Sequence, residues 1–290
     1  METGPIKTQD NSLEWVCLKV SFLIFWISNM GIMLYEVSRH CDFPIGICKW
    51  IDFSLLFSPF GKSIIAGTIF ILSLFYLLEK WMEKVTLMMF LASFIITSYH
   101  ESSGIQHHAT VFSCLLGVQF LAYLFKRLNA SFDLNFNRIH YSVQIIAAFY
   151  ILAGISKLTV SGLDWINNGN YFAIQVVKNF SFIYFAEGNV EKLNEGFQIG
   201  NKLLVNQGWI KLFLSLALLL ELGCIVAVLT KKIRIWYGLA LMGMHIGIKL
   251  IMAIPIGAVA PPMVIYFINP LYWFVKSVKA SYLNKKEKTE

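Results

Sequence analysis

Ionisable side chains inside long apolar segments are the first residues of this sequence that could do chemistry. Glu221 and His245 lie in two consecutive apolar segments, and Lys249 follows His245 by four residues, so it shares the same helical face. Counting 1.5 Å per residue along the predicted helices places Glu221 and His245 near the middle of a membrane. Charged groups are rare and costly there, which makes these residues candidates for a catalytic site. The cluster fits a proton relay or a substrate-polarising site, and it fits a mutually neutralising structural network equally well.

Lys157 lies at the end of another apolar segment, after Ala153 and Gly154. A lysine in this place is often an anchor at the membrane interface. A lysine in a dry cavity can instead lose its proton near neutral pH and act as a base. Burial decides between the two roles, so both stay open at the level of the sequence. Lys19 lies only about one turn inside the first apolar segment, where snorkelling to the interface explains it.

Four further titratable residues, His100, Glu101, His107 and His108, lie in a predicted short loop. Adjacent histidines resemble metal ligands, but this spacing matches no tight zinc site, so we expect solvated loop histidines and no metal. No haem-attachment, Cys-x-x-Cys, phosphate-loop or Gly-x-Ser-x-Gly motif occurs. A redox or quinone site stays open.

Cys41 and Cys48 share one predicted loop. They can form a disulfide if that loop faces an oxidising compartment and if the geometry permits it. The sequence leaves this bridge undecided.

Long apolar segments must position all of these residues. The chain has 290 residues, of which 57% are hydrophobic and 14% are charged, whereas soluble domains carry about 25% charged residues. Several apolar runs approach or exceed the 18 residues that a membrane-crossing helix needs. We therefore predict one all-α domain over 1–290, a polytopic transmembrane bundle of about eight helices. The predicted helices lie near 15–35, 62–78, 84–99, 109–125, 139–157, 210–230, 235–254 and 256–275.

The distribution of charge predicts the topology. The formal charge is +7, and its basic residues gather in short loops and in the tail 276–290 on the side that would hold both termini. Basic loops on one side mark the cytoplasm, so we predict that both termini are cytoplasmic and that the chain crosses the cell membrane several times. The lipid bilayer is the expected partner, and no basic stripe with interleaved aromatics suggests nucleic acid. Residues 1–11 lack the pattern of a removable signal peptide.

The segment 158–209 is the largest polar element between predicted spans, and it would lie on the outer side. It combines acidic residues with aromatic stretches. We expect an amphipathic element that lies in the membrane interface or caps the bundle.

The segment from His140 through Lys157 to Gly169 resembles the HTTM family, the membrane domain shared by vitamin K-dependent gamma-carboxylases and many bacterial proteins. The resemblance lies in an apolar helix that ends Ala153-Gly154-x-x-Lys157-Leu158, followed by Asp164-Trp165 and Gly169. It extends loosely over 100–255, with a later helix that contains His245. Some stand-alone bacterial members resemble maturation factors of secreted peptides, such as the SdpB-like proteins.

The resemblance implies a role for Lys157 as the base linked to oxygenation of a hydroquinone, with His107 or His108 as a supporting group. The spacing from Lys157 to Asp164 is longer than in the carboxylase pattern, and the large soluble portion of the carboxylases is not present after the last helix. We therefore do not expect peptide carboxylation itself.

Two hypotheses follow. The first is a quinone- or lipid-dependent oxidoreductase or carboxylase-like enzyme, whose site in the outer leaflet uses Lys157, His245, Lys249 and Glu221. The second is a non-catalytic accessory protein for maturation or export of a small secreted peptide, which would contact segment 158–209. A transporter is less favoured, because it would need broken helices or paired halves.

Overall fold

The computed structural model describes residues 5–36, 46–102, 109–254 and 260–287. Within these ranges every regular element is a helix. Seven helices there are long and apolar enough to cross a membrane, judged by length and composition. The described chain forms two compact units, called unit 1 (1–146 and 261–290) and unit 2 (147–260) below. Whether the chain folds as one domain, as the sequence suggests, stays a prediction.

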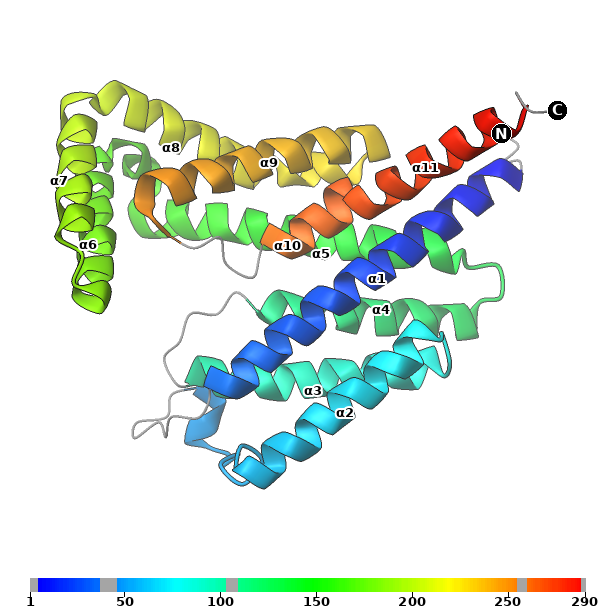
Figure 1. Ribbon diagram of the computed structural model, residues 1–290. Helices are drawn as coiled ribbons and strands as arrows, with labels where there is room; N and C mark the ends of the chain where they lie inside the picture. The colour runs from blue at the N-terminus through cyan, green and yellow to red at the C-terminus, as the bar shows by residue number, and fades with distance from the viewer. Residues whose placement is uncertain (1–4, 37–45, 103–108, 255–259, 288–290) are drawn as a thin grey trace. The chain divides into compact units, whose positions relative to one another are not determined.

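Unit 1 contains the first four long helices and the end of the chain (Figure 1). Its elements are α1 (Pro5–Glu36), η1 (Gly46–Lys49), α2 (Pro59–Leu77), α3 (Met82–Ser102), α4 (Thr110–Leu128), the first part of α5 (Leu134–Ser161), α10 (Ala260–Met263), the π-helical η4 (Val264–Ile268) and α11 (Pro270–Glu287). α3 packs against α2 and α4, while α1 packs against α2, α3 and α11. Large side chains that are almost fully buried fill the space between them, among them Trp15, Phe22, Trp26, Tyr76 and Phe112.

Unit 2 contains the second part of α5 and the remaining long helices. Its other elements are η2 (Gly162–Asn167), α6 (Gly169–Glu187), α7 (Val190–Val205), α8 (Gln207–Leu222), η3 (Gly223–Val228) and α9 (Lys231–Met252). α6 and α7 form a tight antiparallel hairpin. Gly188 ends α6 with a φ of 70°, a conformation that favours glycine, and the Asn189 side chain caps the start of α7. Figure 1 shows that this hairpin runs across the direction of α8 and α9.

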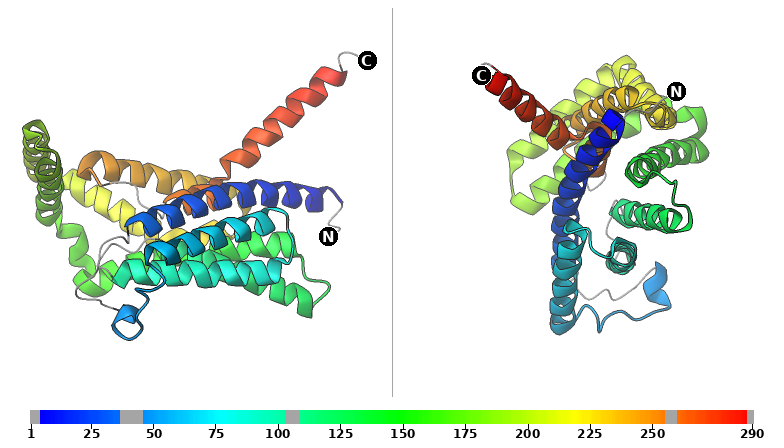
Figure 2. Two further views of the ribbon diagram at one scale, coloured as in Figure 1. Left: turned by 60° about the horizontal axis from the view of Figure 1, so that its bottom comes forward. Right: turned by 90° about the vertical axis from the view of Figure 1, so that its right-hand side faces the viewer.

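The first seven predicted helices each correspond to one of the candidate membrane spans. The eighth, predicted over 256–275, is interrupted in its described part, because Asn269 adopts a left-handed φ of 53° and Pro270 starts a new helix. α11 then continues into the basic tail, and its far end extends away from the other helices of unit 1 (Figure 2). Segment 158–209 forms the end of α5, η2, the α6–α7 hairpin and the first residues of α8.

Candidate functional site

An ion pair inside unit 2 joins two of the residues that the sequence singles out. The Lys157 ammonium donates hydrogen bonds to both carboxylate oxygens of Glu221. The Glu221 side chain is 8% exposed and that of Lys157 is 26% exposed. The pair is therefore largely sequestered, with the lysine as its more accessible member.

A glycine lets the two helices of this pair approach each other. A Cβ atom added to Gly154 would lie 2.8 Å from Leu222 Cδ2 and 3.3 Å from Glu221 Cβ. A side chain at this position would require Leu222 to move aside or α5 to shift away from α8. Gly154 lies one turn before Lys157 in α5, so its missing side chain allows the lysine to reach Glu221.

A second polar pair lies beside the first. The Tyr150 hydroxyl and His245 Nε2 share a hydrogen bond of 2.7 Å, and the two rings meet edge to face. Tyr150 is seven residues before Lys157 in α5, so both side chains lie on one face of that helix. The Glu221 carboxylate is close enough to Tyr150 to interact with it electrostatically. Lys157, Glu221, Tyr150 and His245 are called the unit 2 polar cluster below.

Trp165 completes one side of this cluster. The Lys157 Nζ atom lies 5.3 Å from the centre of the Trp165 ring, within the range of a cation–π contact. The Trp165 indole N–H is buried and has no hydrogen-bond partner among the described residues. The neighbouring Asp164 is exposed.

The structure does not bring Lys249 into this arrangement. Lys249 is exposed on α9, and Glu221 is paired with Lys157 from α5. The expected Glu–His–Lys cluster is thus replaced by two neighbouring pairs, Lys157 with Glu221 and Tyr150 with His245. Tyr150 is a residue that the sequence reasoning missed, because a tyrosine in an apolar segment gives no signal until its partner is known.

The histidine-bearing loop is only partly described. His100 is buried in α3, and its Nε2 atom lies 3.0 Å from a Glu36 carboxylate oxygen, so it is not a solvated loop residue. Glu101 accepts a hydrogen bond from the Thr110 hydroxyl. His107, His108 and Cys41 lie outside the described residues, while Cys48 is half-buried, so the Cys41–Cys48 bridge stays a prediction. Among the described residues no three potential ligands are grouped so that they could hold a metal ion.

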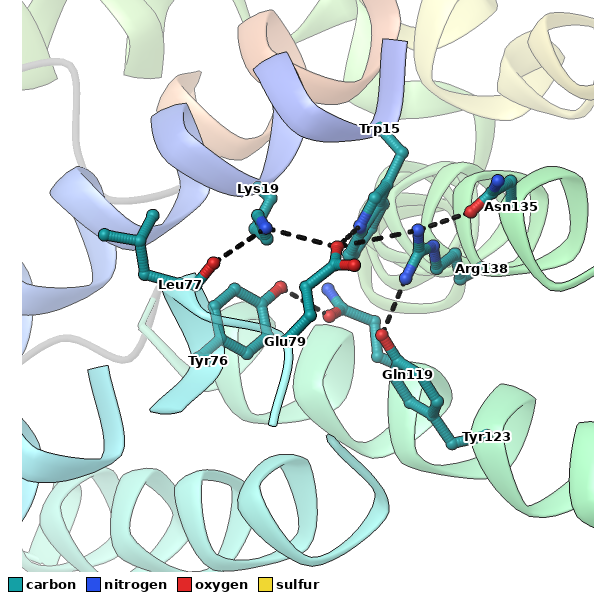
Figure 3. Close-up of polar contacts among 9 residues, drawn as sticks. All are labelled: Trp15, Lys19, Tyr76, Leu77, Glu79, Gln119, Tyr123, Asn135 and Arg138. Carbon is teal, nitrogen blue, oxygen red and sulfur yellow. Dashed lines mark hydrogen bonds and ion pairs between the residues drawn. The ribbon is translucent and has the colours of Figure 1, made fainter. Parts of the chain in front are cut away.

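Unit 1 contains a charged cluster around Glu79, which sequence reasoning missed (Figure 3). Glu79 lies in the turn between α2 and α3 and adopts a left-handed φ of 54°. Its carboxylate accepts hydrogen bonds of 3.1 Å from Lys19 and 3.0 Å from the Trp15 indole. Lys19 also donates to the Leu77 carbonyl oxygen and is buried, so its ammonium is held by protein groups at the end of α2.

Arg138 is the second buried cation of this cluster. Its guanidinium lies 3.6 Å from the centre of the Trp15 ring, donates a 2.6 Å hydrogen bond to Tyr123 and approaches Glu79 at 3.9 Å. Partial burial of the Glu79 carboxyl opposes its ionisation. The hydrogen bonds from Lys19 and Trp15 and the charges of Lys19 and Arg138 outweigh this effect and lower the pKa of Glu79. The spacing of Trp15 and Lys19, one helical turn apart, is the only sequence signal that could have indicated a shared partner.

A buried chain of uncharged groups also lies in unit 1. The Tyr76 hydroxyl donates to the Gln119 side-chain oxygen at 2.7 Å, and the Gln119 amide donates to the Tyr266 hydroxyl at 2.9 Å. Tyr266 belongs to the π-helical segment η4. Because each of these groups is satisfied internally, the chain fixes α2, α4 and η4 to one another.

The two clusters differ in what they can do chemically. In unit 1 one half-exposed carboxylate is held by two buried cations, an arrangement that supports structure. In unit 2 a carboxylate, a partly accessible ammonium group, a phenol and an imidazole lie together, and an unsatisfied indole N–H adjoins them. This combination can accept a proton and stabilise a negative charge. No protein-family model, curated protein or solved structure matches this chain.

Proposed function

We propose that the chain is a multispanning protein of the cell membrane whose unit 2 polar cluster binds a quinone-type or related lipid amphiphile and moves a proton at its polar head. The observation that carries this proposal is the largely sequestered ion pair between Lys157 and Glu221, beside the hydrogen-bonded Tyr150 and His245. Ionisable groups that are sequestered in apolar helices are costly, and they mark sites of function.

The ion pair suggests which residue supplies the positive charge and which residue accepts the proton. We assign Lys157, the donor of both hydrogen bonds, as the positive charge, and Glu221, whose carboxylate accepts them, as the proton acceptor. This division differs from the role of base that the HTTM resemblance implies for Lys157. A carboxylate and an ammonium group on the same hydroxyl group can remove its proton and stabilise the charge that remains.

The proposed step breaks the O–H bond of a hydroquinone hydroxyl. Its proton passes to the Glu221 carboxylate, and the negative charge left on the oxygen is stabilised by the Lys157 ammonium. Tyr150 and His245, which lie beside Glu221, offer the next positions for the proton. The aromatic face and the free N–H of Trp165 suit the ring and the oxygen of such a substrate.

The remaining parts of the proposal come from the sequence. Membership of the HTTM family is supported by the run from Ala153 to Gly169, and the eight crossings with both termini in the cytoplasm are supported by the basic loops. With this topology the end of α5 and the hairpin of unit 2 face away from the cytoplasm.

Binding of a hydroquinone tests the proposal. The protein would be reconstituted in nanodiscs with a prenylated 1,4-naphthohydroquinone under anaerobic conditions, and ionisation of the hydroquinone would be followed by absorbance as the pH is raised. We expect the bound hydroquinone to ionise at a lower pH than in empty nanodiscs, because Lys157 stabilises the anion. Lys157→Met should remove this shift, and Lys211→Met, at an exposed lysine of α8, should retain it.

Two results would overturn the proposal. One is a hydroquinone that ionises at the same pH with the protein and in empty nanodiscs. The other is a Lys157→Met protein that inserts normally and still shows the full shift. A non-catalytic accessory protein would also show no shift, and it would copurify with a secreted peptide instead.

A further inference from the structure

An apolar stripe lies uncovered along α6 in unit 2. Its members are spaced by three or four residues, so they share one helical face. They are Tyr171, Ile174, Lys178, Phe182 and Phe185. The four apolar members are between 61% and 79% exposed, although soluble surfaces rarely present such a row of large apolar side chains.

The opposite face of α6 is already occupied by α7. A Cβ atom on Gly196 would lie 2.4 Å from Phe180 Cβ, and one on Gly200 would lie 2.7 Å from Val177 Cγ2. The two glycines are four residues apart, so α6 and α7 approach each other closely along this line. The stripe therefore points away from α7 and needs another partner.

The outer face of α7 is polar, in contrast to the outer face of α6. Most residues of α7 that point away from the two glycines are exposed and hydrophilic, and the apolar exception is Val205 at the end of the helix. The hydrophilic residues are Glu191, Asn194, Glu195, Gln198, Asn201 and Lys202. The hairpin thus has an aromatic side on α6 and a water-compatible side on α7.

The connections of the hairpin place it at the end of two candidate membrane spans. α6 begins at Gly169, just after the span Leu134–Asn167, and α7 ends at Val205, just before the span Gln207–Val228. The Asn179 side chain also donates a 2.9 Å hydrogen bond to the Met252 carbonyl oxygen at the end of α9. In Figure 1 the hairpin runs across the direction of α8 and α9. If those two helices span a membrane, the hairpin lies along the membrane surface.

We propose that the stripe on α6 lies in the membrane, at the boundary between phospholipid headgroups and acyl chains, so that the hairpin is an interfacial platform. The exposed apolar residues Trp209, Leu212, Leu216 and Leu219 of α8 continue the apolar surface beyond the hairpin. Aromatic rings prefer this boundary, and an amphipathic helix binds there through its apolar face.

The charge in the stripe favours phospholipid over a second copy of the chain. Lys178 lies at the centre of the stripe, with its ammonium 5.8 Å from the Phe182 ring centre. In a symmetric antiparallel pair of α6 helices, Lys178 would face the same lysine of the other copy. Against a bilayer the same lysine can extend to a lipid phosphate while its stem stays among the acyl chains.

Photo-crosslinking in the full-length protein tests this placement independently of the proposed function. p-Benzoylphenylalanine would replace Ile174 or Phe182 in the stripe, or Gln198 on the polar face of α7 as the matched control. Each protein would be reconstituted in vesicles of phosphatidylcholine and phosphatidylglycerol and irradiated. We expect lipid adducts, detected by mass spectrometry, at Ile174 and Phe182, with only background at Gln198.

Other outcomes would overturn the proposal. Crosslinked dimers at the stripe positions would show that a second copy covers α6. An absence of lipid adducts at both stripe positions, in proteins that insert and elute as the wild type does, would show that the stripe faces water. Equal lipid labelling at Gln198 would show that the hairpin is immersed rather than interfacial.

Discussion

Lys157 in α5 donates to both carboxylate oxygens of Glu221 in α8, although the two residues are 64 positions apart in the sequence. The pair makes unit 2 sensitive to the loss of either charge. When one partner of a buried ion pair is removed, the other charge stays in an apolar place without compensation. Loss of both charges at once avoids that penalty.

Single and double substitutions at this pair should therefore differ in the size of their effect on stability. Glu221→Leu should lower the free energy of unfolding by about 3 kcal/mol, because Lys157 loses its partner. The double variant Lys157→Met with Glu221→Leu should recover most of that loss. Denaturant unfolding in detergent micelles, followed by circular dichroism, measures both values, and a double variant as unstable as Glu221→Leu would contradict the argument.

The close approach at Gly154 gives a second prediction. Gly154→Val should destabilise unit 2 by about 1–3 kcal/mol, because the added atoms overlap Leu222 and press on Glu221 Cβ. It should also weaken hydroquinone binding if the proposed function holds, since Lys157 would be displaced from Glu221. Thermal unfolding and the nanodisc titration provide the two readouts. Unchanged stability would mean that Leu222 moves aside freely.

Hydropathy predicted the long helices because burial in lipid requires runs of apolar residues whatever their partners are. It also drew attention to Lys157 and Glu221, since a charge in such a run is conspicuous. The residues that pair with Lys157 and Glu221 could not be predicted from hydropathy. Equal depth and a shared face suggested that Glu221 would join His245 and Lys249, but the helix that approaches Glu221 is α5, at Gly154.

Glu79 provides a prediction about pH. Its folded pKa is lowered from the ordinary value of 4.5. The carboxylate therefore contributes stability above that value, and this contribution is lost as the pH falls through the lowered pKa. Glu79→Gln should destabilise the protein at pH 7, because Lys19 and Arg138 lose their shared carboxylate, and the difference from wild type should shrink in acid. Melting temperatures of both proteins at pH 7 and below pH 4.5 check this, and a constant difference would contradict it.

The cluster around Glu79 also shows why part of the structure was beyond the sequence. Glu79 lies in a short polar turn between two apolar helices, where acidic and basic residues are ordinary. Its importance depends on a left-handed backbone conformation that turns the side chain towards Lys19 and Trp15. The burial of Lys19 depends on the same turn, and counting residues from the helix end gives no information about that turn.

The Tyr150–His245 pair predicts an effect on proton transfer rather than on folding. Tyr150→Phe removes one hydrogen bond of 2.7 Å and should lower stability by only about 1 kcal/mol. If the proton passes from Glu221 towards His245, the same change should slow the exchange of that proton. Stopped-flow pH jumps on hydroquinone-loaded nanodiscs measure the rate, and a wild-type rate in Tyr150→Phe would exclude this route.

The α6–α7 hairpin provides the sharpest test of packing, because unit 2 contains its own control. Gly196→Ala adds an atom that would lie 2.4 Å from Phe180 Cβ, which is too near the backbone to move alone, so α6 and α7 must separate. Gly243→Ala in α9 meets nothing within 4 Å. We expect Gly196→Ala to destabilise the protein by about 1–3 kcal/mol. Gly243→Ala should instead stabilise it by up to about 1 kcal/mol, because alanine favours a helix.

Limited proteolysis of the reconstituted protein should then cut the hairpin faster in Gly196→Ala alone. Equal cutting of both variants would mean that the close approach at Gly196 and Gly200 does not hold α6 and α7 together.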